Sequence, residues 1–532
     1  MIIAKALPGF KGLLSLAAWP VHFACHISAF LSAFVLHRGT MSCTQAATLL
    51  PQQRRNVATL TRWLAQMGHS RDLLVCLRSA TLLLEAELAR PGDFLFILDG
   101  TKRHSQGRYF ENSYSCGNSK RTPRQQRQGK GKRKQYKNHP RRCHSFICGL
   151  LLTPGGLRLP YWRPYYTEEH CRNIDHPFAT DAQLAAQMIL ELQLPPTAQV
   201  VVLGDTAYDA EVIRSACAQR GFRWVVPANP ERVLECQPNT FRLTVQAKTA
   251  LLKAKVPAQV LAKLDELTDQ VLSPEAFVAA VGQALSPSEW QQFSKPLLKH
   301  GREKRPKVRA LTEELSSKAF EPVRLSLEHG PHRQQRRLSA SRGGPGKYPQ
   351  RTFWVHRRTE DVHSVGMVVL LFSNKQRQPQ GTGATGCAKG KVDKILMSNA
   401  FEATTEQLVG WYDLRWQIEL FFKECKGVLG LDHYRLGKFV QVEGWVELCL
   451  SAFCYLEWYR AKQLLRTDLS KEQRQFWLRA RTHDLCQGVR QHLEEEEAEA
   501  MIEMMQTAEG RRELAAALRA ACSATSGTPK AA

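Results

Sequence analysis

The spacing of apolar residues predicts helices in the first ninety residues of the chain. Residues 44–67 and 71–88 carry apolar side chains at helical intervals, with arginines between them. Residues 12–36 are apolar enough to resemble a membrane segment, but Pro20 and two histidines interrupt the run. We therefore expect buried helices there, rather than a signal peptide or a membrane span.

From residue 94 onward, short β-rich runs replace the helical pattern. Strands are expected at 94–98, 144–153, 157–162, 199–203 and 222–226, with helices at 179–194 and 210–220. Glycines at 155 and 156 can turn the second strand into the third as a hairpin. Two strands lead directly into an aspartate and a turn, because Asp99 follows the first strand and Asp205 follows the fourth. This order of elements predicts an α/β fold.

The second half of the chain is less regular, with helical pieces and basic loops between residues 227 and 351. The expected elements after it are a hairpin at 352–356 and 365–372, a strand at 394–397, and helices at 404–426 and 440–464. Thr404 or Thr405 can cap the first of these helices. The tail is helical and acidic, and it ends in a Ser-, Gly-, Thr- and Pro-containing segment typical of disorder.

The helix expected at 404–426 has two chemically different faces. At about 100° per residue, Tyr412, Arg415, Glu419 and Lys426 fall within an arc of roughly 60°, and Lys423 lies close to it. The opposite face is apolar and can pack on a sheet; it carries Leu414, Ile418, Phe421 and Cys425. The polar face therefore presents one carboxylate flanked by three cations and a phenol.

Asp99, Asp205 and Glu419 together favour an active site. Alone, a carboxylate among cations is commonly an i,i+4 salt-bridge face, and an aspartate at a strand end is commonly a turn former. Three carboxylates in this element order can hold two divalent ions, which activate an attacking oxygen and stabilise a leaving one at a phosphodiester. Mg²⁺ prefers oxygen ligands and keeps several waters, so three carboxylates suffice.

Composition narrows the class of partner. The 532 residues include 74 Lys and Arg against 49 Asp and Glu, a net charge of +25, which favours a polyanion such as nucleic acid. The length predicts two to four domains.

Fifteen cysteines include no C-x-x-C pair, so we expect reduced thiols. The group Cys116, His139, Cys143, His144 and Cys148 matches no zinc spacing, and free thiols and solvated histidines are the expectation there.

The densest basic stretch is residues 120–142, which contain eleven Lys and Arg and no acidic residue. Lys130, Lys132, Arg133 and Lys134 lie at its centre. Close to Asp99 in sequence, this segment would contact DNA phosphates beside the cut site, although a solvated loop is the alternative. Reading of specific DNA sequence is assigned instead to the N-terminal helices, where Arg54, Arg55 and Arg62 are candidates.

At its carboxylates the sequence resembles the bacterial cut-and-paste DDE transposases of the insertion sequence 4 family. Their signature Y-x2-R-x3-E-x6-K is matched at every position by Tyr412, Arg415, Glu419 and Lys426. Asp99, in Leu98-Asp99-Gly100-Thr101, and Asp205, in Gly204-Asp205-Thr206-Ala207-Tyr208-Asp209, correspond to the first two carboxylates. The resemblance covers roughly residues 94–464.

The resemblance implies an RNase H-like core in which Asp99, Asp205 and Glu419 are catalytic and hold two Mg²⁺ ions, with Mn²⁺ as a substitute. Tyr412, Arg415, Lys423 and Lys426 would contact DNA. Some members stack an aromatic residue of the inserted domain on a displaced base, for which Trp354 is a candidate, although a buried strand residue is the alternative. The segment 102–142 departs from the family, since it is longer and more basic than the simple turn expected there.

We therefore expect an RNase H-like mixed sheet flanked by helices, with an insertion between the fifth strand and the helix of the third carboxylate. The expected parts are a DNA-end-binding helical region at 1–90, a core at 91–227 and 372–465, an insertion at 228–371, and a helical C-terminal region at 466–532. The function expected is cleavage of transposon ends and strand transfer into target DNA, by a homodimer or higher oligomer in a bacterial cytoplasm. The alternatives are a nuclease or resolvase that does not join DNA, and an inactive DNA-binding derivative.

Overall fold

The computed structural model describes residues 21–37, 57–70, 72–105, 110–116, 141–235, 307–315, 317–325, 351–375 and 392–512, together with isolated positions between them. The chain divides into two compact units. The first comprises Met1–Phe222, Ser326–Pro349 and Trp411–Ala532, and the second comprises Arg223–Leu325 and Gln350–Gly410. The finer division into five parts stays a prediction.

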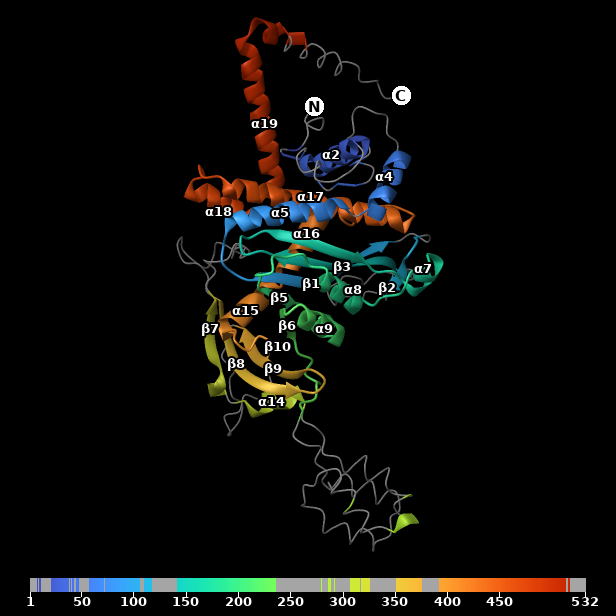
Figure 1. Cartoon of the computed structure of the whole chain (residues 1–532), viewed down its shortest axis with the longest axis vertical. Helices are drawn as coiled ribbons and strands as arrows, with labels where there is room; N and C mark the ends of the chain where they lie inside the picture. Colours follow the sequence, from blue (N-terminus) through green and yellow to red (C-terminus); the bar gives the residue numbers. More distant parts are fainter. Residues whose placement is uncertain are drawn as a thin grey trace, which may run out of the picture. The chain divides into compact units, whose positions relative to one another are not determined.

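The first unit contains a mixed sheet (Figure 1). Its strands are β1 (Phe94–Ser105), β2 (Tyr114–Cys116), β3 (Arg141–Leu152), β4 (Arg158–Pro164) and β5 (Val200–Leu203). β3 pairs antiparallel with β1 on one edge and with β2 and β4 on the other, whereas β5 runs parallel to β1. Helices flank the strands, so the predicted mixed α/β class is confirmed.

β1 is longer than the sequence predicted. The expectation of a strand that ends in a turn at Asp99 is wrong, because β1 continues to Ser105. Its second half is paired with β3 from Asp99↔Cys148 to Ser105↔Arg142. This half is polar, so it carries no apolar alternation. The backbone groups of β3, distant in sequence, provide the hydrogen bonds that make it a strand.

The helices α8 (Asp181–Leu190) and α9 (Glu211–Gln219) match two predicted helices of the first unit. Thr180 caps α8, and its side chain accepts a hydrogen bond from the Gln183 N–H in a capping box. The short elements β2, α7 (Glu168–Asn173) and η2 (Thr206–Tyr208) were not predicted. They are too brief to show a periodic pattern.

The centre of the first unit is the helix α17 (Phe439–Leu465). It packs against α2 (Val21–Leu36), α4 (Val57–Ser70), α5 (Asp72–Leu88) and β4 (Figure 1). Among the described residues, α17 alone is long and apolar enough to cross a membrane, yet 89% of that window is buried inside the protein. Such burial is what a core helix shows. The described side chains of α2 are largely buried too, as expected for part of the apolar stretch at 12–36.

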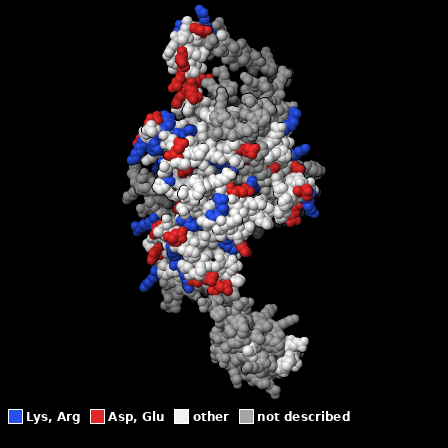
Figure 2. Space-filling model, in the orientation of Figure 1, with Lys and Arg blue, Asp and Glu red and all other residues white. Residues whose placement is uncertain are grey.

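Two further helices complete the C-terminal region of this unit. These are α18 (Lys471–Arg479) and α19 (Thr482–Gln506). The last side chain of α19 that is buried is Leu493. Beyond it the helix is strongly acidic, and Figure 2 shows its carboxylates gathered along α19.

Four charged side chains form a buried network in the first unit. Arg158 on β4 lies 3.1 Å from Glu424 and 2.9 Å from Glu457, measured between guanidinium nitrogens and carboxylate oxygens. Arg460 lies 3.3 Å from the other oxygen of Glu457. Thr482 at the start of α19 donates its hydroxyl to Glu424 at 2.7 Å. The network is charge-balanced and connects β4, α16 (Gln417–Gly427), α17 and α19.

The second unit contains an antiparallel sheet in the order β6-β10-β9-β8-β7. Its strands are β6 (Arg223–Pro227), β7 (Glu321–Leu325), β8 (Arg351–Val362), β9 (Gly366–Lys375) and β10 (Lys394–Ser398), with the helix α14 (Val308–Glu314) beside them in the chain. The predicted hairpin is β8 and β9, and both strands extend beyond the predicted bounds. Trp354 lies on β8 and is half-buried.

The expectation of reduced thiols throughout is wrong at one position. Cys143 on β3 is disulfide-bonded. The free cysteines among the described residues are Cys76, Cys148, Cys171, Cys217, Cys425, Cys449, Cys454 and Cys486. Composition alone cannot predict a single disulfide, because it depends on which cysteines the fold brings together.

The buried network predicts a large cost for losing one acidic partner. Replacing Glu457, which is fully buried, by Gln leaves the two arginines with Glu424 as the one remaining carboxylate of the network, and so with one uncompensated positive charge. We expect the free energy of unfolding to fall by about 3–5 kcal/mol, measured by urea denaturation. The matched control is Glu191→Gln, which removes a surface ion pair with Arg163 and should change stability little. Equal effects of the two substitutions would contradict the assignment.

Candidate functional site

Asp99 and Asp205 lie on neighbouring parallel segments of the first unit. β1 and β5 pair in register up to Ile97↔Leu203. Asp99 lies two residues after Ile97, and Asp205 lies two residues after Leu203. Both side chains therefore belong to the same edge of the sheet. The sequence pattern of two apolar strands, each followed by an aspartate, therefore corresponds to adjacent positions in space.

Both aspartates are oriented by local backbone groups. One carboxylate oxygen of Asp99 accepts a hydrogen bond from the Gly100 N–H at 2.8 Å. Asp205 caps η2, and its Oδ1 accepts from the Ala207 N–H at 2.8 Å. Each carboxylate thus uses one oxygen to fix its own side-chain conformation.

The helix that carries Glu419 is not continuous. The single helix predicted at 404–426 is two helices, α15 (Thr405–Leu414) and α16 (Gln417–Gly427), so that prediction is wrong. Between them the hydrogen bonds tighten to three-residue spacing: the Arg415 N–H donates to the Tyr412 carbonyl at 3.1 Å, and the Glu419 N–H donates to the Trp416 carbonyl at 3.1 Å. The common arc calculated for Tyr412, Arg415, Glu419 and Lys426 therefore does not apply as one helix face.

A side-chain contact joins the two helical segments instead. The Arg415 guanidinium lies 2.7 Å from the Glu419 carboxylate. Lys426, later on α16, lies with its Nζ 3.5 Å from the Lys102 carbonyl on β1, and Lys423 is exposed. Of the four signature residues, Glu419 and Lys426 thus lie on α16, Arg415 lies in the turn before it, and Tyr412 belongs to α15.

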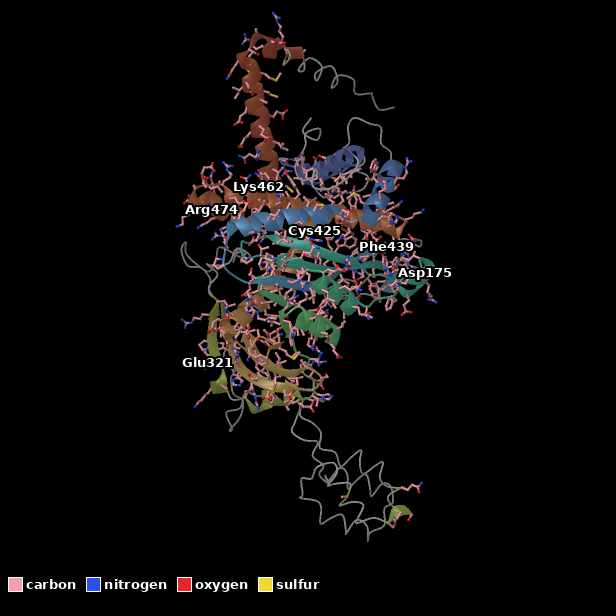
Figure 3. The ribbon with its side chains drawn as sticks, in the orientation of Figure 1. Asp175, Glu321, Cys425, Phe439, Lys462 and Arg474 are labelled. Carbon is pink, nitrogen blue, oxygen red and sulfur yellow. The ribbon has the colours of Figure 1, made fainter. Side chains whose placement is uncertain are left out.

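The other side of α16 packs into the core. Ile418, Phe421 and Cys425 are completely buried, as their spacing predicted, and Cys425 lies in the interior of the unit (Figure 3). Phe421 meets Phe453 of α17 edge-on, with ring centroids 4.9 Å apart. The apolar face therefore fixes which way Glu419 is directed.

Electrostatics link the three carboxylates. Burial raises the pKa of Asp99, and the negative charges of Asp205 and Glu419 raise it further, against the hydrogen bond from Gly100 and the charge of Arg415. Burial lowers the pKa of Arg415, but its hydrogen bond to Glu419 and the surrounding acids outweigh burial and raise it. Burial raises the pKa of Tyr412 to about 12, so its phenol stays protonated. Acidic groups from β1, the end of β5 and α16 therefore act on one another.

The donor chemistry of this site suits a hard divalent cation. Asp99, Asp205 and Glu419 offer carboxylate oxygens, and a positive ion would offset the repulsion that raises the pKa of Asp99. In the part of the chain that the structure describes, no group of three or more His, Cys, Asp or Glu side chains is close enough to hold a metal ion. Glu419 is held by Arg415 instead.

Sequence reasoning assigned no role to one residue of this region, Tyr208. It is 5% exposed, and it is the last residue of η2, the short helix that begins directly after Asp205. Its phenol is close enough to Asp99 and Asp205 for both charges to raise its pKa, after burial. The Gly204-to-Asp209 motif contains this tyrosine, but only the folded packing shows where its ring lies.

Several predicted DNA contacts lie outside the described residues. Lys130, Lys132, Arg133 and Lys134 are among them, as are Arg54 and Arg55. Arg62 is exposed on α4. Arg142, at the end of the basic segment, donates to both the hydroxyl and the carbonyl of Ser113 at 2.7 Å. Its guanidinium therefore stabilises the contact between β3 and the residues before β2.

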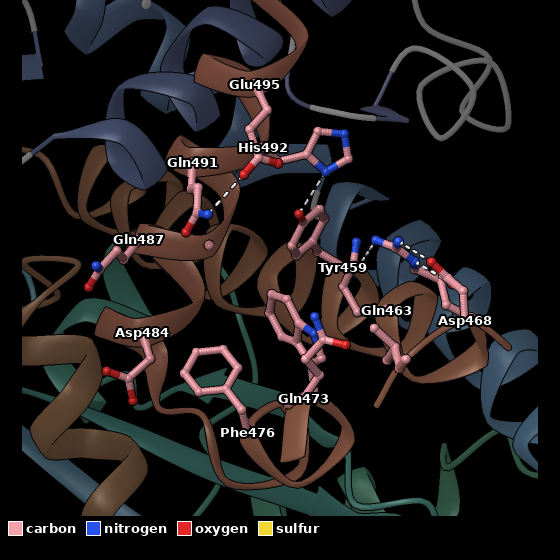
Figure 4. Close-up of a pocket in the computed structure, with 14 residues that line it drawn as sticks. Tyr459, Gln463, Asp468, Gln473, Phe476, Asp484, Gln487, Gln491, His492 and Glu495 are labelled. Carbon is pink, nitrogen blue, oxygen red and sulfur yellow. Dashed lines mark hydrogen bonds and ion pairs between the residues drawn. The ribbon is translucent and has the colours of Figure 1, made fainter. Parts of the chain in front are cut away.

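A cavity of about 520 Å³ lies elsewhere in the same unit, among α17, α18 and α19 (Figure 4). Its walls include Tyr459, Trp477, Asp484 and His492, and the Tyr459 hydroxyl lies 2.9 Å from the His492 ring. None of the predicted site residues lines it. This cavity is therefore separate from the carboxylate site.

The raised pKa of Asp99 predicts a stability signature. Because its folded-state pKa lies above the unfolded value, ionised Asp99 costs stability above that pKa, and the cost disappears at low pH. With chelator at pH 7, Asp99→Asn should raise the melting temperature, by roughly 1–2 °C for a unit of this size. Added Mn²⁺ should then stabilise the wild type more than the variant. The control is Glu499→Gln on the exposed half of α19. A variant that is less stable than the wild type in chelator would argue against charge crowding.

Comparison with known proteins identifies the family. The model of the family described as Transposase DDE domain matches residues 179–456, just over half of the chain. The match includes Asp205, Glu419 and the Tyr-Arg-Glu-Lys signature, and it begins after Asp99. No curated protein sequence matches the chain. A domain of this kind implies DNA binding and a transposase-type function in DNA cleavage and joining, for which divalent metals are generally used. The chain belongs to the Transposase DDE domain family.

Proposed function

We propose that this protein is a bacterial transposase of the insertion sequence 4 type. It binds the ends of a transposon, cleaves the DNA there and joins the freed 3′ ends to target DNA. The observation that carries this proposal is the electrostatic coupling of Asp205, Glu419 and Arg415 to Asp99, in a chain that belongs to a DDE transposase family. The order β4-β3-β1-β5, with only β1 and β5 parallel, supports an RNase H-like core.

Asp99, Asp205 and Glu419 are the residues that would hold two Mg²⁺ ions, or Mn²⁺ in their place. When bound, such ions supply an activated oxygen nucleophile and stabilise the leaving oxygen. The protein positions the carboxylates: backbone N–H groups orient the two aspartates, and the packed face of α16 orients Glu419. Three carboxylates without cations would repel DNA, so the charge of the ions also permits the substrate to approach.

The cations around the carboxylates would bind the DNA backbone. Arg415 presents a planar guanidinium suited to phosphate, and Lys426 and Lys423 present point charges. Tyr412 keeps its hydroxyl proton, because its pKa is raised to about 12, and can donate a hydrogen bond to a phosphate oxygen. Arg415 pairs with Glu419, and this contact restricts both side chains.

The wider assignments rest on charge and resemblance. A net charge of +25 supports binding to double-stranded DNA, both transposon ends and target. A homodimer or higher oligomer on DNA, and a place in the bacterial cytoplasm at the nucleoid, belong to the same proposal.

The carboxylates can be tested one at a time. Alanine in place of Asp99, Asp205 or Glu419 should abolish cleavage of a labelled DNA end in Mg²⁺ while leaving gel-shift affinity within about twofold, since each change removes a metal ligand but no phosphate contact. Glu211→Ala, an exposed site on α9, is the control and should remain active. Cleavage without strand transfer by the wild type would identify a nuclease or resolvase. Binding without either reaction would identify an inactive derivative.

The basic segment can be tested by salt titration. Replacing Lys130, Lys132, Arg133 and Lys134 by alanine should weaken binding to specific and random DNA about equally. The slope of log affinity against log salt should flatten by roughly one unit for each phosphate that the variant no longer neutralises. Fluorescence anisotropy at several salt concentrations measures both effects. An unchanged slope would show that this segment makes no phosphate contact.

A further inference from the structure

We infer that Tyr208 is a positioning residue of the carboxylate site: its buried ring sets the spacing between Asp99 and Asp205, and its hydroxyl provides a proton donor on the protein side of Asp99. This inference rests on the proposed function, because it assigns a role toward the metal-binding carboxylates. Tyr208 lies in the turn after β5, and its hydroxyl lies near Gly100 of β1.

The turn that carries Tyr208 is fixed at both ends. Asp205 caps η2 through the Ala207 N–H, as described above. At the other end, the Asp209 carboxylate lies 2.7 Å from the Arg214 guanidinium on α9, and both side chains are largely buried. These two contacts restrict the backbone of the three-residue helix. The turn therefore determines the direction of the Tyr208 side chain.

Gly204 provides the space for the tyrosine. A Cβ added at Gly204 would lie 2.7 Å from the Tyr208 Cβ and 3.3 Å from its Cγ. The first distance is shorter than the contacts that real Cβ atoms make. The Tyr208 Cβ and Cγ are close to the backbone, so they cannot move aside as the end of a flexible side chain could. A glycine is therefore required directly before Asp205 for Tyr208 to fold back over the end of β5.

The far end of the phenol reaches β1. A Cβ added at Gly100 would lie 3.7 Å from the Tyr208 hydroxyl oxygen, an ordinary contact distance. Gly100 directly follows Asp99, and its N–H is the group that orients the Asp99 carboxylate. The length of one tyrosine side chain therefore spans the gap between the Asp205 turn and the Asp99 strand.

The groups that act on the hydroxyl are acidic. Burial is the largest cause that disfavours loss of the phenol proton, and the carboxylates of Asp99 on β1, Asp181 on α8 and Asp205 itself add to it. A phenol that keeps its proton can donate a hydrogen bond and does not compete with carboxylates as an anionic ligand. The tyrosine therefore suits a role beside the site rather than in it.

Two variants separate the ring from the hydroxyl. Tyr208→Phe keeps the spacing and removes the donor, whereas Tyr208→Leu also removes the spacing. We expect Tyr208→Phe to need about threefold to tenfold more Mn²⁺ for its half-maximal rise in melting temperature, with little change in melting temperature in chelator. Tyr208→Leu should lower kcat for DNA cleavage by about a hundredfold, as a misplacement near 1 Å does, with little change in KM for DNA.

The matched control is Tyr161→Phe. Tyr161 is also a buried tyrosine of this unit, but it lies on β4, with its ring against Phe96 and beneath Arg78. Loss of its hydroxyl should leave the Mn²⁺ midpoint unchanged. Gly204→Ala provides an independent route to the same defect, because its methyl group displaces Tyr208.

The outcomes distinguish this inference from the function it rests on. A Tyr208→Phe protein with the wild-type Mn²⁺ midpoint, in an enzyme that cleaves DNA, overturns the inference and leaves the function intact. A lower melting temperature in chelator with an unchanged midpoint also overturns it, because that is the result of a purely structural role. A wild type that neither binds Mn²⁺ nor cleaves DNA overturns the proposed function and this inference with it.

Discussion

The buried network of Arg158, Glu424, Glu457 and Arg460 is the constraint on which the carboxylate site depends. Charges that leave water are costly, and only close pairing offsets the cost, so these side chains tolerate few arrangements. Burial lowers the pKa of Arg460 to about 10, which shows how strongly the interior opposes its charge. Because Glu424 lies on α16, five residues after Glu419, the network that fixes one also limits where the other can lie.

The site itself is built in the opposite way, with like charges held together. The pKa of Asp99 is raised by burial and by the charges of two further carboxylates, so ionised Asp99 costs stability in this part of the unit. Such an arrangement persists only when other contacts determine the backbone. The ladder of β1 with β3, the cap of Asp205 on η2 and the apolar face of α16 are those contacts.

The sequence predicted the parts whose signal is local. The buried strands and the helix α17 have apolar runs or periodic patterns, and the mixed α/β class follows from their order. The polar half of β1 was missed because its partner β3 lies some forty residues away in the chain. The break at Arg415 was missed because periodicity cannot detect a tightened turn. Asp99 and Asp205 were found from the apolar runs that precede them, whereas Tyr208 needed the contacts with Gly204 and Gly100.

The break between α15 and α16 has a consequence for how the signature works. On one straight helix, Tyr412, Arg415, Glu419 and Lys426 would keep fixed mutual positions. With the break, Arg415 lies at a tight turn between two helices, and its contact with Glu419 is made across that turn. In the proposed function, a guanidinium at such a junction would exchange a carboxylate for a phosphate with little change in α16, which the buried network holds. The same spacing in sequence thus combines a fixed carboxylate with a cation whose partner can change.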